Sequence, residues 1–204
     1  MLFYDSPNPA PNPRRVRIFL AEKGVRVPVA PVSIAGGEHR SEAYLAVNPY
    51  GQTPSLALDN GAVLTESIAI CRYFEALHPE PPLFGRGALN VATVDMWTRR
   101  VELRLMTPLG MVWAHTHPFT ARVVKPQYRD FGESQRSRVT AAMAEFDRAL
   151  APREWLDGER YTIADIVLLR AIDFATFVGV PLPTELSALA DWHARASARP
   201  SAAA

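Results

Sequence analysis

Two short segments of the first hundred residues carry groups that could bind a small polar ligand. Residues 48–54 read Asn-Pro-Tyr-Gly-Gln-Thr-Pro, and residues 65–67 read Thr-Glu-Ser directly before a stretch with helical spacing. Ser67 offers a hydroxyl and a backbone N–H at the expected start of a helix, where a carboxylate is favoured. Taken singly, Pro54 could be an ordinary turn proline, and Glu66 could be an acid that favours the first turn of a helix.

The elements that must position these segments alternate between strand and helix over the first eighty residues. Asn12 before Pro13 has the form of an N-cap followed by proline at the first helical position. The Asn-Gly step within residues 59–61 predicts a β-hairpin, and the first β-α-β unit favours a parallel pair of strands. The predicted order is β-α-β-α-β-β-α, at residues 2–4, 13–24, 27–34, 41–47, 55–58, 62–64 and from a cap at Thr65 onward.

Prolines and glycines between residues 79 and 87 predict a linker between two domains, at residues 1–78 and 88–204. Beyond the linker the spacing of apolar residues is helical throughout. A long helical stretch covers residues 91–113, and Pro108 is expected to kink it because proline lacks the N–H that a helix interior needs. The second domain is therefore predicted to be all-helical.

Three further patterns define the later helices. Val139, Met143, Phe146 and Leu150 mark one apolar face of a helix. Residues 162–165 read Thr-Ile-Ala-Asp, which has the form of a capping box with Asp in place of the usual Glu. Residues 185–198 form the last predicted helix.

The composition indicates a globular protein and gives no electrostatic reason to expect nucleic acid. The 204 residues are 48% apolar, and 22 basic against 21 acidic residues leave a formal net charge of +1. Cys71 is the only cysteine, so no intrachain disulfide can form. The sequence begins without signal-peptide character, and no apolar run approaches the ~18 residues that span a bilayer. We therefore expect a cytoplasmic protein without a membrane segment, and the many arginines and alanines suggest a bacterial source.

The whole chain resembles the cytosolic glutathione S-transferase superfamily. The resemblance rests on the order of the elements and on motifs in the correct places: residues 48–54 before the hairpin, 65–67 after it, and 162–165 with an apolar continuation. It implies an α+β thioredoxin-like N-terminal domain followed by an all-α helical bundle. It also implies a homodimer that uses glutathione as co-substrate and needs no metal.

The resemblance assigns ligand contacts to the two segments. In the family, the proline that matches Pro54 is cis, and the backbone N–H and C=O of Thr53 would pair with the cysteinyl unit of glutathione. Glu66 would accept from the ligand's ammonium group, and Ser67 would hold its γ-glutamyl carboxylate. Gln52, His39 and Arg40 are candidates for the glycyl carboxylate, although a solvated loop is the alternative for the last two.

The group that would activate the glutathione thiol is harder to assign. A thiol with a pKa near ~8.5 is only a few per cent ionised at neutral pH, and lowering that pKa by about two units takes roughly 2.7 kcal/mol. The family's usual hydroxyl position falls on Ala10, which cannot donate. Asn12 matches an asparagine used by some classes and is the first candidate; Ser6 and Tyr4 are the alternatives.

The second substrate is expected to lie against the long helix of the second domain. Met106, Met111 and Trp113 could line its pocket, although residues at helical spacing are more often plain core. His115 and His117 lack further metal ligands nearby, so no metal site is predicted. The arginines at 14, 15 and 17 are interpreted as a solvated helix face, and Cys71 as a packed core residue.

Three functions remain open at this point. The first is conjugation of glutathione to small electrophiles, as in detoxification. The second is glutathione-dependent reduction of a disulfide or peroxide. The third is a non-catalytic glutathione-binding module, because Ala10 leaves the usual donor position empty and fold does not fix function. The isomerase class carries a Ser-Ser-Cys motif early in the chain, and this sequence has none.

Overall fold

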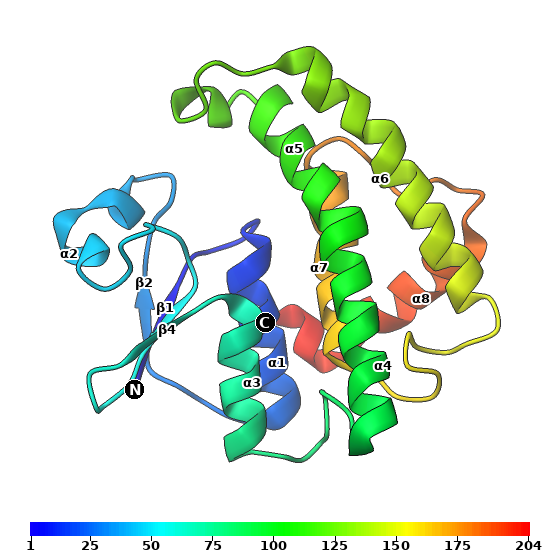
Figure 1. Cartoon of the computed structure of the whole chain (residues 1–204), viewed down its shortest axis with the longest axis horizontal. Coiled ribbons are helices and arrows are strands. Elements are labelled where there is room, and N and C mark those ends of the chain that lie inside the picture. The colour runs from blue at the N-terminus through cyan, green and yellow to red at the C-terminus, as the bar shows by residue number, and fades with distance from the viewer. The chain divides into compact units, whose positions relative to one another are not determined.

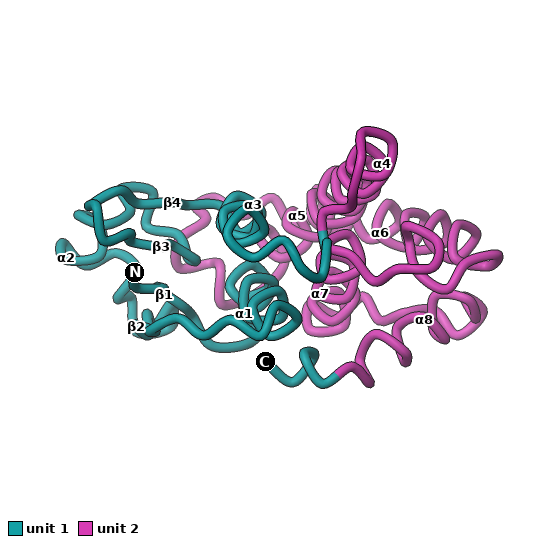
Figure 2. Tube along the Cα trace, turned by 90° about the horizontal axis from the view of Figure 1, so that it is seen from below, with its two compact units in different colours: residues 1–83, 200–204 teal, residues 84–199 magenta.

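The computed structural model describes all 204 residues and divides them into two compact units. Unit 1 contains residues Met1–Leu83 and Pro200–Ala204, and unit 2 contains Phe84–Arg199; Figure 2 colours them separately. The last five residues thus belong to the first unit, whereas the sequence led us to expect them in the helical domain. None of the helices combines the length and apolar character that crossing a membrane requires.

Unit 1 is built on a four-stranded mixed sheet in the order β2-β1-β3-β4. The strands are β1 (Leu2–Asp5), β2 (Val29–Pro31), β3 (Ser55–Ala57) and β4 (Val63–Thr65). Strand β1 pairs in parallel with β2 and antiparallel with β3, and β3 and β4 form the predicted hairpin. Strand β2 is shorter than the predicted 27–34; it begins only after Pro28, which has no N–H for a strand ladder.

The helices of unit 1 cover both faces of this sheet. Helices α1 (Pro11–Lys23) and α3 (Ser67–Leu77) pack together on one face, and the short α2 (Glu42–Leu45) lies on the other (Figure 1). Single 3-10 turns occupy Glu38–Arg40 and Pro200–Ala203. The core of the unit consists of fully buried apolar side chains, among them Phe3, Val16, Phe19, Leu56, Ile70 and Phe74. This thioredoxin-like arrangement is the predicted one.

Two helix starts differ from the prediction. Helix α1 begins at Pro11 with Ala10 as its N-cap, so Asn12 is the second helical residue and does not cap the helix. Pro11 takes the favoured first helical position, which the sequence analysis assigned to Pro13. Helix α3 begins at Ser67 with Glu66 as N-cap, because Thr65 is still paired with Ser55 in the sheet.

Unit 2 is all-helical, as predicted, with a short π-helical interruption. Its helices are α4 (Gly87–Arg100), a π-helix (Val101–Met106), α5 (Thr107–Thr116), a 3-10 turn (Thr120–Arg122), α6 (Arg129–Leu150), α7 (Ile163–Phe177) and α8 (Ser187–Ser197). The π-helix ends at Met106, two residues before Pro108, the residue expected to disturb the long helix, because proline cannot donate to the preceding turn.

The start of α7 is fixed by the predicted capping box. Asp165 is fully buried, and its carboxylate accepts from the Thr162 amide and hydroxyl, each at 3.0 Å. The same carboxylate accepts from the Leu156 amide at 3.0 Å and from the Trp192 indole N–H at 3.1 Å. One acid therefore ties α7, α8 and the loop before α7 into a single core.

Candidate functional site

The loop at residues 48–54 is held by a network around the Gln52 carbonyl. The Thr53–Pro54 peptide bond is cis. The Gln52 carbonyl accepts from the Tyr44 hydroxyl at 2.6 Å and from the Asn48 side-chain amide at 2.7 Å. Both donors also contact the buried Ser55 hydroxyl, at 3.0 and 3.2 Å. The residue before Thr53 is thus fixed from two sides, and the Gln52 side chain extends into solvent.

Thr53 presents a free backbone edge. Neither its amide nor its carbonyl takes part in a hydrogen bond within the chain. Its hydroxyl lies 2.8 Å from Ser6 Oγ, and Ser6 in turn donates to the Val32 carbonyl at 2.8 Å. Because a hydroxyl has one proton, Thr53 must donate to Ser6. The Thr53 side chain is therefore fastened to β1 while its backbone groups remain available to a ligand.

The turn into α3 places a strained residue beside free amides. Glu66 has φ 66° and ψ 117° and is the only residue other than glycine with a positive φ. Such a conformation costs about 1–3 kcal/mol and is found at functional sites. The first-turn amides of Ser67, Ile68 and Ala69 have no partners inside the helix. The exposed Glu66 carboxylate and these amides provide an acceptor for a cation next to a site for an anion.

Arg15 lies behind Ser67 and supports this anion site. The expectation that the arginines of α1 form a solvated helix face was therefore wrong. The Arg15 side chain is only 4% exposed, and its Nη1 donates to Ser67 Oγ at 3.4 Å. Because Ser67 accepts there, its own proton can be given to a ligand oxygen. Arg14 and Arg17 are engaged as well: Arg14 donates to the carbonyls of Ala202 and Ala204. All three arginines of α1 thus have structural partners.

The structure brings Arg40 and His39 against the same loop. Arg40 Nη1 donates to the Tyr50 carbonyl at 3.2 Å. A Cβ on Gly51 would lie 2.8 Å from the His39 carbonyl and 2.9 Å from Arg40 Nη1, so glycine is required for this approach. Burial, and then the charge of Arg40, lower the pKa of His39, which leaves the ring neutral at pH 7. Arg40 is the cation at this end of the loop.

The first turn of α1 offers a single backbone donor. Pro11 and Pro13 have no N–H, and the Ala10 amide donates to the Pro7 carbonyl at 3.3 Å. The Asn12 amide is therefore the only unpaired N–H at this helix start, and the Asn12 side chain is exposed. Of the alternatives, Ser6 gives its proton to Val32, and the half-buried Tyr4 ring packs edge-on to Tyr44 at 5.6 Å.

Two family models match the chain. Residues 10–77 match the glutathione S-transferase N-terminal domain, and residues 95–195 match the glutathione S-transferase C-terminal domain. Glutathione S-transferase 2 of Saccharomyces cerevisiae is 35% identical over 98% of this chain and 87% of its own length. The chain belongs to the glutathione S-transferase family.

Two further relatives show how far the likeness extends. Maleylacetoacetate isomerase of Pseudomonas aeruginosa is 33% identical over 82% of this chain and 78% of its own length. The crystal structure of a glutathione S-transferase domain-containing protein from Marinobacter aquaeolei superposes with a TM-score of 0.92 at 37% identity, covering 98% of this chain and 99% of that one. Both units of the fold are therefore those of the family.

The candidate second-substrate residues of this glutathione S-transferase are half-buried and are not gathered on one face. Met111 and Trp113 are two residues apart on α5, so they point to roughly opposite sides of the helix. Trp113 lies within an aromatic cluster, with ring centroids at 4.2 Å from His117, 5.9 Å from Phe119 and 5.6 Å from Phe177. Met106 lies at the end of the π-helix.

The histidine and cysteine candidates have structural surroundings. The Nδ1 atoms of His115 and His117 accept from the Tyr128 and Phe119 amides at 3.3 and 3.2 Å. No group of three or more His, Cys, Asp or Glu side chains has the arrangement of a metal site. Cys71 is fully buried, and this burial raises the pKa of its thiol far above the usual value. Cys71 is a packed core residue, as predicted.

Several residues that shape the glutathione S-transferase site were not found in the sequence. Tyr44 and Ser55 complete the network that fixes Gln52, and Arg15 orients Ser67. Tyr44 reads in the sequence as one apolar position of a short helix. Arg15 reads as surface, because a buried arginine differs from an exposed one only through partners distant in the chain. No local signal marks either of them.

Proposed function

We propose that this protein binds glutathione in unit 1, stabilises its thiolate and conjugates it to small electrophiles. The observation that carries the proposal is the free backbone edge of Thr53 at the cis-Pro54 bond. In the proposed complex this edge pairs with the cysteinyl unit, as one strand pairs with another. Glu66 accepts from the ligand ammonium, and the amides and hydroxyl at Ser67 bind the γ-glutamyl carboxylate.

The glycyl end of glutathione is assigned to the other side of the loop. Its carboxylate is matched by the exposed guanidinium of Arg40 and by the Gln52 side-chain amide. His39 contributes a neutral N–H at most, because its lowered pKa removes the positive charge at pH 7. A zwitterionic tripeptide thus meets an acceptor at its ammonium and donors at both carboxylates.

The thiolate is assigned to the start of α1. The Asn12 amide and the positive end of the helix dipole are the donors there, with the Asn12 side-chain amide as a second donor. A hydrogen bond to a charged group contributes about 1.5–3 kcal/mol, which covers the roughly 2.7 kcal/mol needed to lower the thiol pKa by about two units. Ser6 is the weaker candidate, because its proton is given to Val32.

Two substitutions of Asn12 separate its backbone from its side chain. Asn12→Ala keeps the N–H, and we expect the pKa of bound glutathione to change by less than about half a unit. Asn12→Pro removes the N–H at a position in the first turn where proline is tolerated. We expect it to raise that pKa by about one unit and to lower kcat/KM roughly tenfold. Titration of the thiolate absorbance measures the pKa of bound glutathione in both variants. An unchanged pKa in Asn12→Pro would show that the Asn12 amide does not stabilise the thiolate.

The three possible functions, two catalytic and one of binding alone, are separated by substrate turnover and by retention on glutathione. Wild-type protein is assayed with glutathione and 1-chloro-2,4-dinitrobenzene, cumene hydroperoxide or hydroxyethyl disulfide, and its retention on glutathione resin is measured in parallel. We expect retention and conjugation of the aromatic chloride. Turnover of the peroxide or disulfide alone would make it a reductase, and retention without turnover a binding module. Loss of retention would overturn all three.

Isomerisation is the activity named for one relative of this chain, maleylacetoacetate isomerase. The segment between β1 and α1, residues 6–10, reads Ser-Pro-Asn-Pro-Ala, without the Ser-Ser-Cys motif of that class. We therefore propose conjugation ahead of isomerisation. Of the candidates Met106, Met111 and Trp113, we propose Trp113 as the contact of the electrophile, because Met111 points to roughly the opposite side of α5 and the rings around Trp113 would favour an aromatic substrate.

We also propose that the protein is a homodimer that uses an apolar row on α4. Leu89 and Met96 are 83% and 39% exposed and lie seven residues apart, on one face of the helix; Leu103, 67% exposed, follows in the π-helix. Met96→Glu combined with Leu103→Glu should convert a species of about 45 kDa, twice the mass of the 22.5 kDa chain, to monomers in sedimentation equilibrium. A monomeric wild type would contradict the dimer.

A further inference from the structure

The segment between β1 and α1 has little to hold its own conformation. Residues 6–10 read Ser-Pro-Asn-Pro-Ala, and both prolines lack an N–H. The only backbone hydrogen bond within the segment runs from the Ala10 amide to the Pro7 carbonyl, at 3.3 Å. Yet this segment sets where α1 begins, and so where the Asn12 amide points. Its geometry must be fixed from elsewhere.

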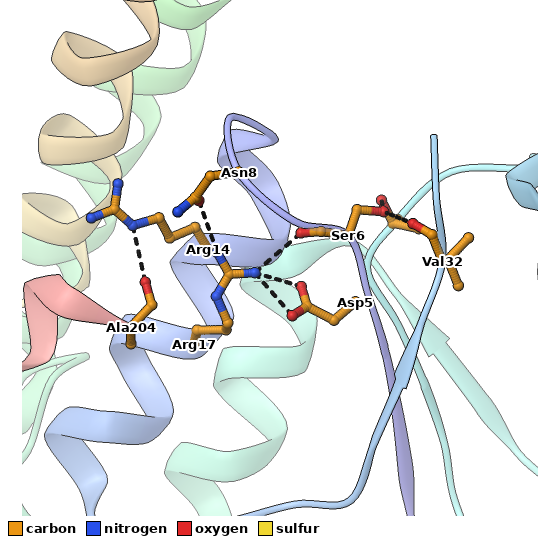
Figure 3. A network of polar contacts seen from close by, with 8 residues as sticks. Asp5, Ser6, Asn8, Arg14, Arg17, Val32 and Ala204 are labelled. Atoms are coloured by element: carbon orange, nitrogen blue, oxygen red, sulfur yellow. Dashed lines mark hydrogen bonds and ion pairs between the residues drawn. The ribbon is translucent and has the colours of Figure 1, made fainter. Parts of the chain in front are cut away.

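The Arg17 guanidinium fixes the conformation of residues 6–10. Arg17 lies in the second turn of α1 and reaches back over the segment (Figure 3). Its Nη1 donates to both Asp5 carboxylate oxygens, at 2.7 and 2.9 Å, and to the Ser6 carbonyl at 3.1 Å. Its Nη2 donates to the Asn8 side-chain oxygen at 2.9 Å. Three residues that precede the helix are thus attached to a single side chain within it.

Ser6 connects the Arg17 contacts with Asp5, Ser6 and Asn8 to the loop that carries Thr53. Its backbone carbonyl accepts from Arg17, and its hydroxyl donates to Val32 (Figure 3). The same hydroxyl lies 2.8 Å from Thr53 Oγ1. A continuous chain of hydrogen bonds therefore runs from α1 through Arg17 and Ser6 to Thr53. One end of the chain lies in the second turn of α1, the helix whose first turn carries the proposed thiolate donor, and the other end is the residue whose backbone would hold the cysteinyl unit.

The contribution of Arg17 is geometric rather than electrostatic. Its charge is neutralised by Asp5, and both side chains are largely shielded, at 19% and 14% exposure. Burial raises the pKa of Asp5, and Arg17 acts against this rise. A lysine could not replace the arginine, because an ammonium is a single point charge without the planar fork that reaches Asp5 and Asn8 from different nitrogens.

We propose that Arg17 is a positioning residue, which sets the register between the start of α1 and Thr53 so that the sulfur of bound glutathione meets the Asn12 amide. This inference rests on the proposed function. It assigns to Arg17 no contact with glutathione. Loss of Arg17 therefore misplaces the sulfur, while the γ-glutamyl end remains bound at Glu66 and Ser67.

The test compares Arg17→Gln and Arg17→Lys with Arg26→Gln, a matched control at an exposed arginine whose side chain makes no hydrogen bond or ion pair within the chain. We expect Arg17→Gln to lower kcat about tenfold and to raise the pKa of bound glutathione by about one unit, with Kd changed less than about threefold. Arg17→Lys should not rescue the pKa. Arg26→Gln should match the wild type. In amide NMR spectra, the Asn12 and Thr53 signals should shift in both Arg17 variants and should not shift in Arg26→Gln.

The outcomes separate the inference from the function on which it rests. A wild type whose bound glutathione keeps the pKa of the free thiol overturns the proposed function, and this inference with it. If the wild type lowers the pKa of bound glutathione and Arg17→Gln lowers it equally, the inference alone is overturned. A lower melting temperature in Arg17→Gln with an unchanged pH profile would also overturn it, since Arg17 would then serve stability only.

Discussion

Replacing Glu66 by glutamine weakens glutathione binding by about 100-fold. The exposed carboxylate at the start of α3 is the only acid that we assign to the ligand ammonium. A hydrogen bond between charged groups contributes about 1.5–3 kcal/mol, which corresponds to a factor of roughly 10–150 in Kd. Glutamine keeps the size of the side chain and removes its charge. Titration calorimetry with glutathione measures the change.

Two companion variants distinguish a ligand contact from a structural role of Glu66. Glu66→Gly should lose the same affinity without loss of stability, because glycine adopts a φ of 66° without steric cost. Glu42→Gln removes an exposed acid elsewhere in unit 1 and should leave the affinity unchanged. Equal Kd values for the wild type and Glu66→Gln would show that the γ-glutamyl end binds elsewhere.

Replacing Asp165 by alanine destabilises the folded chain by about 4 kcal/mol at pH 4.5. The substitution leaves the Leu156 amide, the Thr162 amide and the Trp192 indole N–H buried without an acceptor. Leaving a buried donor without an acceptor costs about 1–3 kcal/mol, so the loss of one shared acceptor for three donors is expected to cost about 4 kcal/mol. Urea unfolding followed by tryptophan fluorescence gives the free energy of unfolding. Asp191→Ala, at an exposed acid of α8, is the control and should change it by less than about 0.5 kcal/mol.

The effect of Asp165 also depends on pH with a defined sign. Burial raises the pKa of Asp165 to about 6, against the four donors that lower it, whereas an unfolded chain gives a value near ~3.9. The folded state therefore binds the Asp165 proton more tightly than the unfolded chain does. The stability that comes from this tighter proton binding is complete below about pH 4 and is lost as the pH rises through 6. The difference in free energy of unfolding between the wild type and Asp165→Ala should narrow by about 2 kcal/mol between pH 4.5 and 7.5. A constant or widening difference would contradict the raised pKa.

Much of the fold could be predicted because its signals are local. The Asn-Gly step predicted the hairpin between β3 and β4, the Thr162–Asp165 pair predicted the start of α7, and Pro108 predicted a disturbance in the long helix. Each of these depends on residues within one turn of the element. The Thr53–Pro54 cis bond was expected from resemblance, and the structure contains it.

The errors arose where burial depends on distant partners. Arg15 and Arg17 were interpreted as solvated, yet Arg15 contacts Ser67, 52 residues away, and Arg17 contacts Asp5. The return of residues 200–204 to α1, held by Arg14 and by a hydrogen bond from Ser201 to Glu22, has no local signal either. Asn12 was misplaced as an N-cap because two prolines compete for the first helical position and only the folded loop decides between them.

The central claim is that this chain binds glutathione and holds it as a thiolate. Titration of the ultraviolet absorbance of the thiolate against pH, with wild-type protein in slight excess over glutathione, tests that claim most directly. We predict an apparent pKa near ~6.5, about two units below that of the free thiol. A pKa that stays near ~8.5 under saturating protein would contradict activation, and the absence of saturable binding would contradict the site itself.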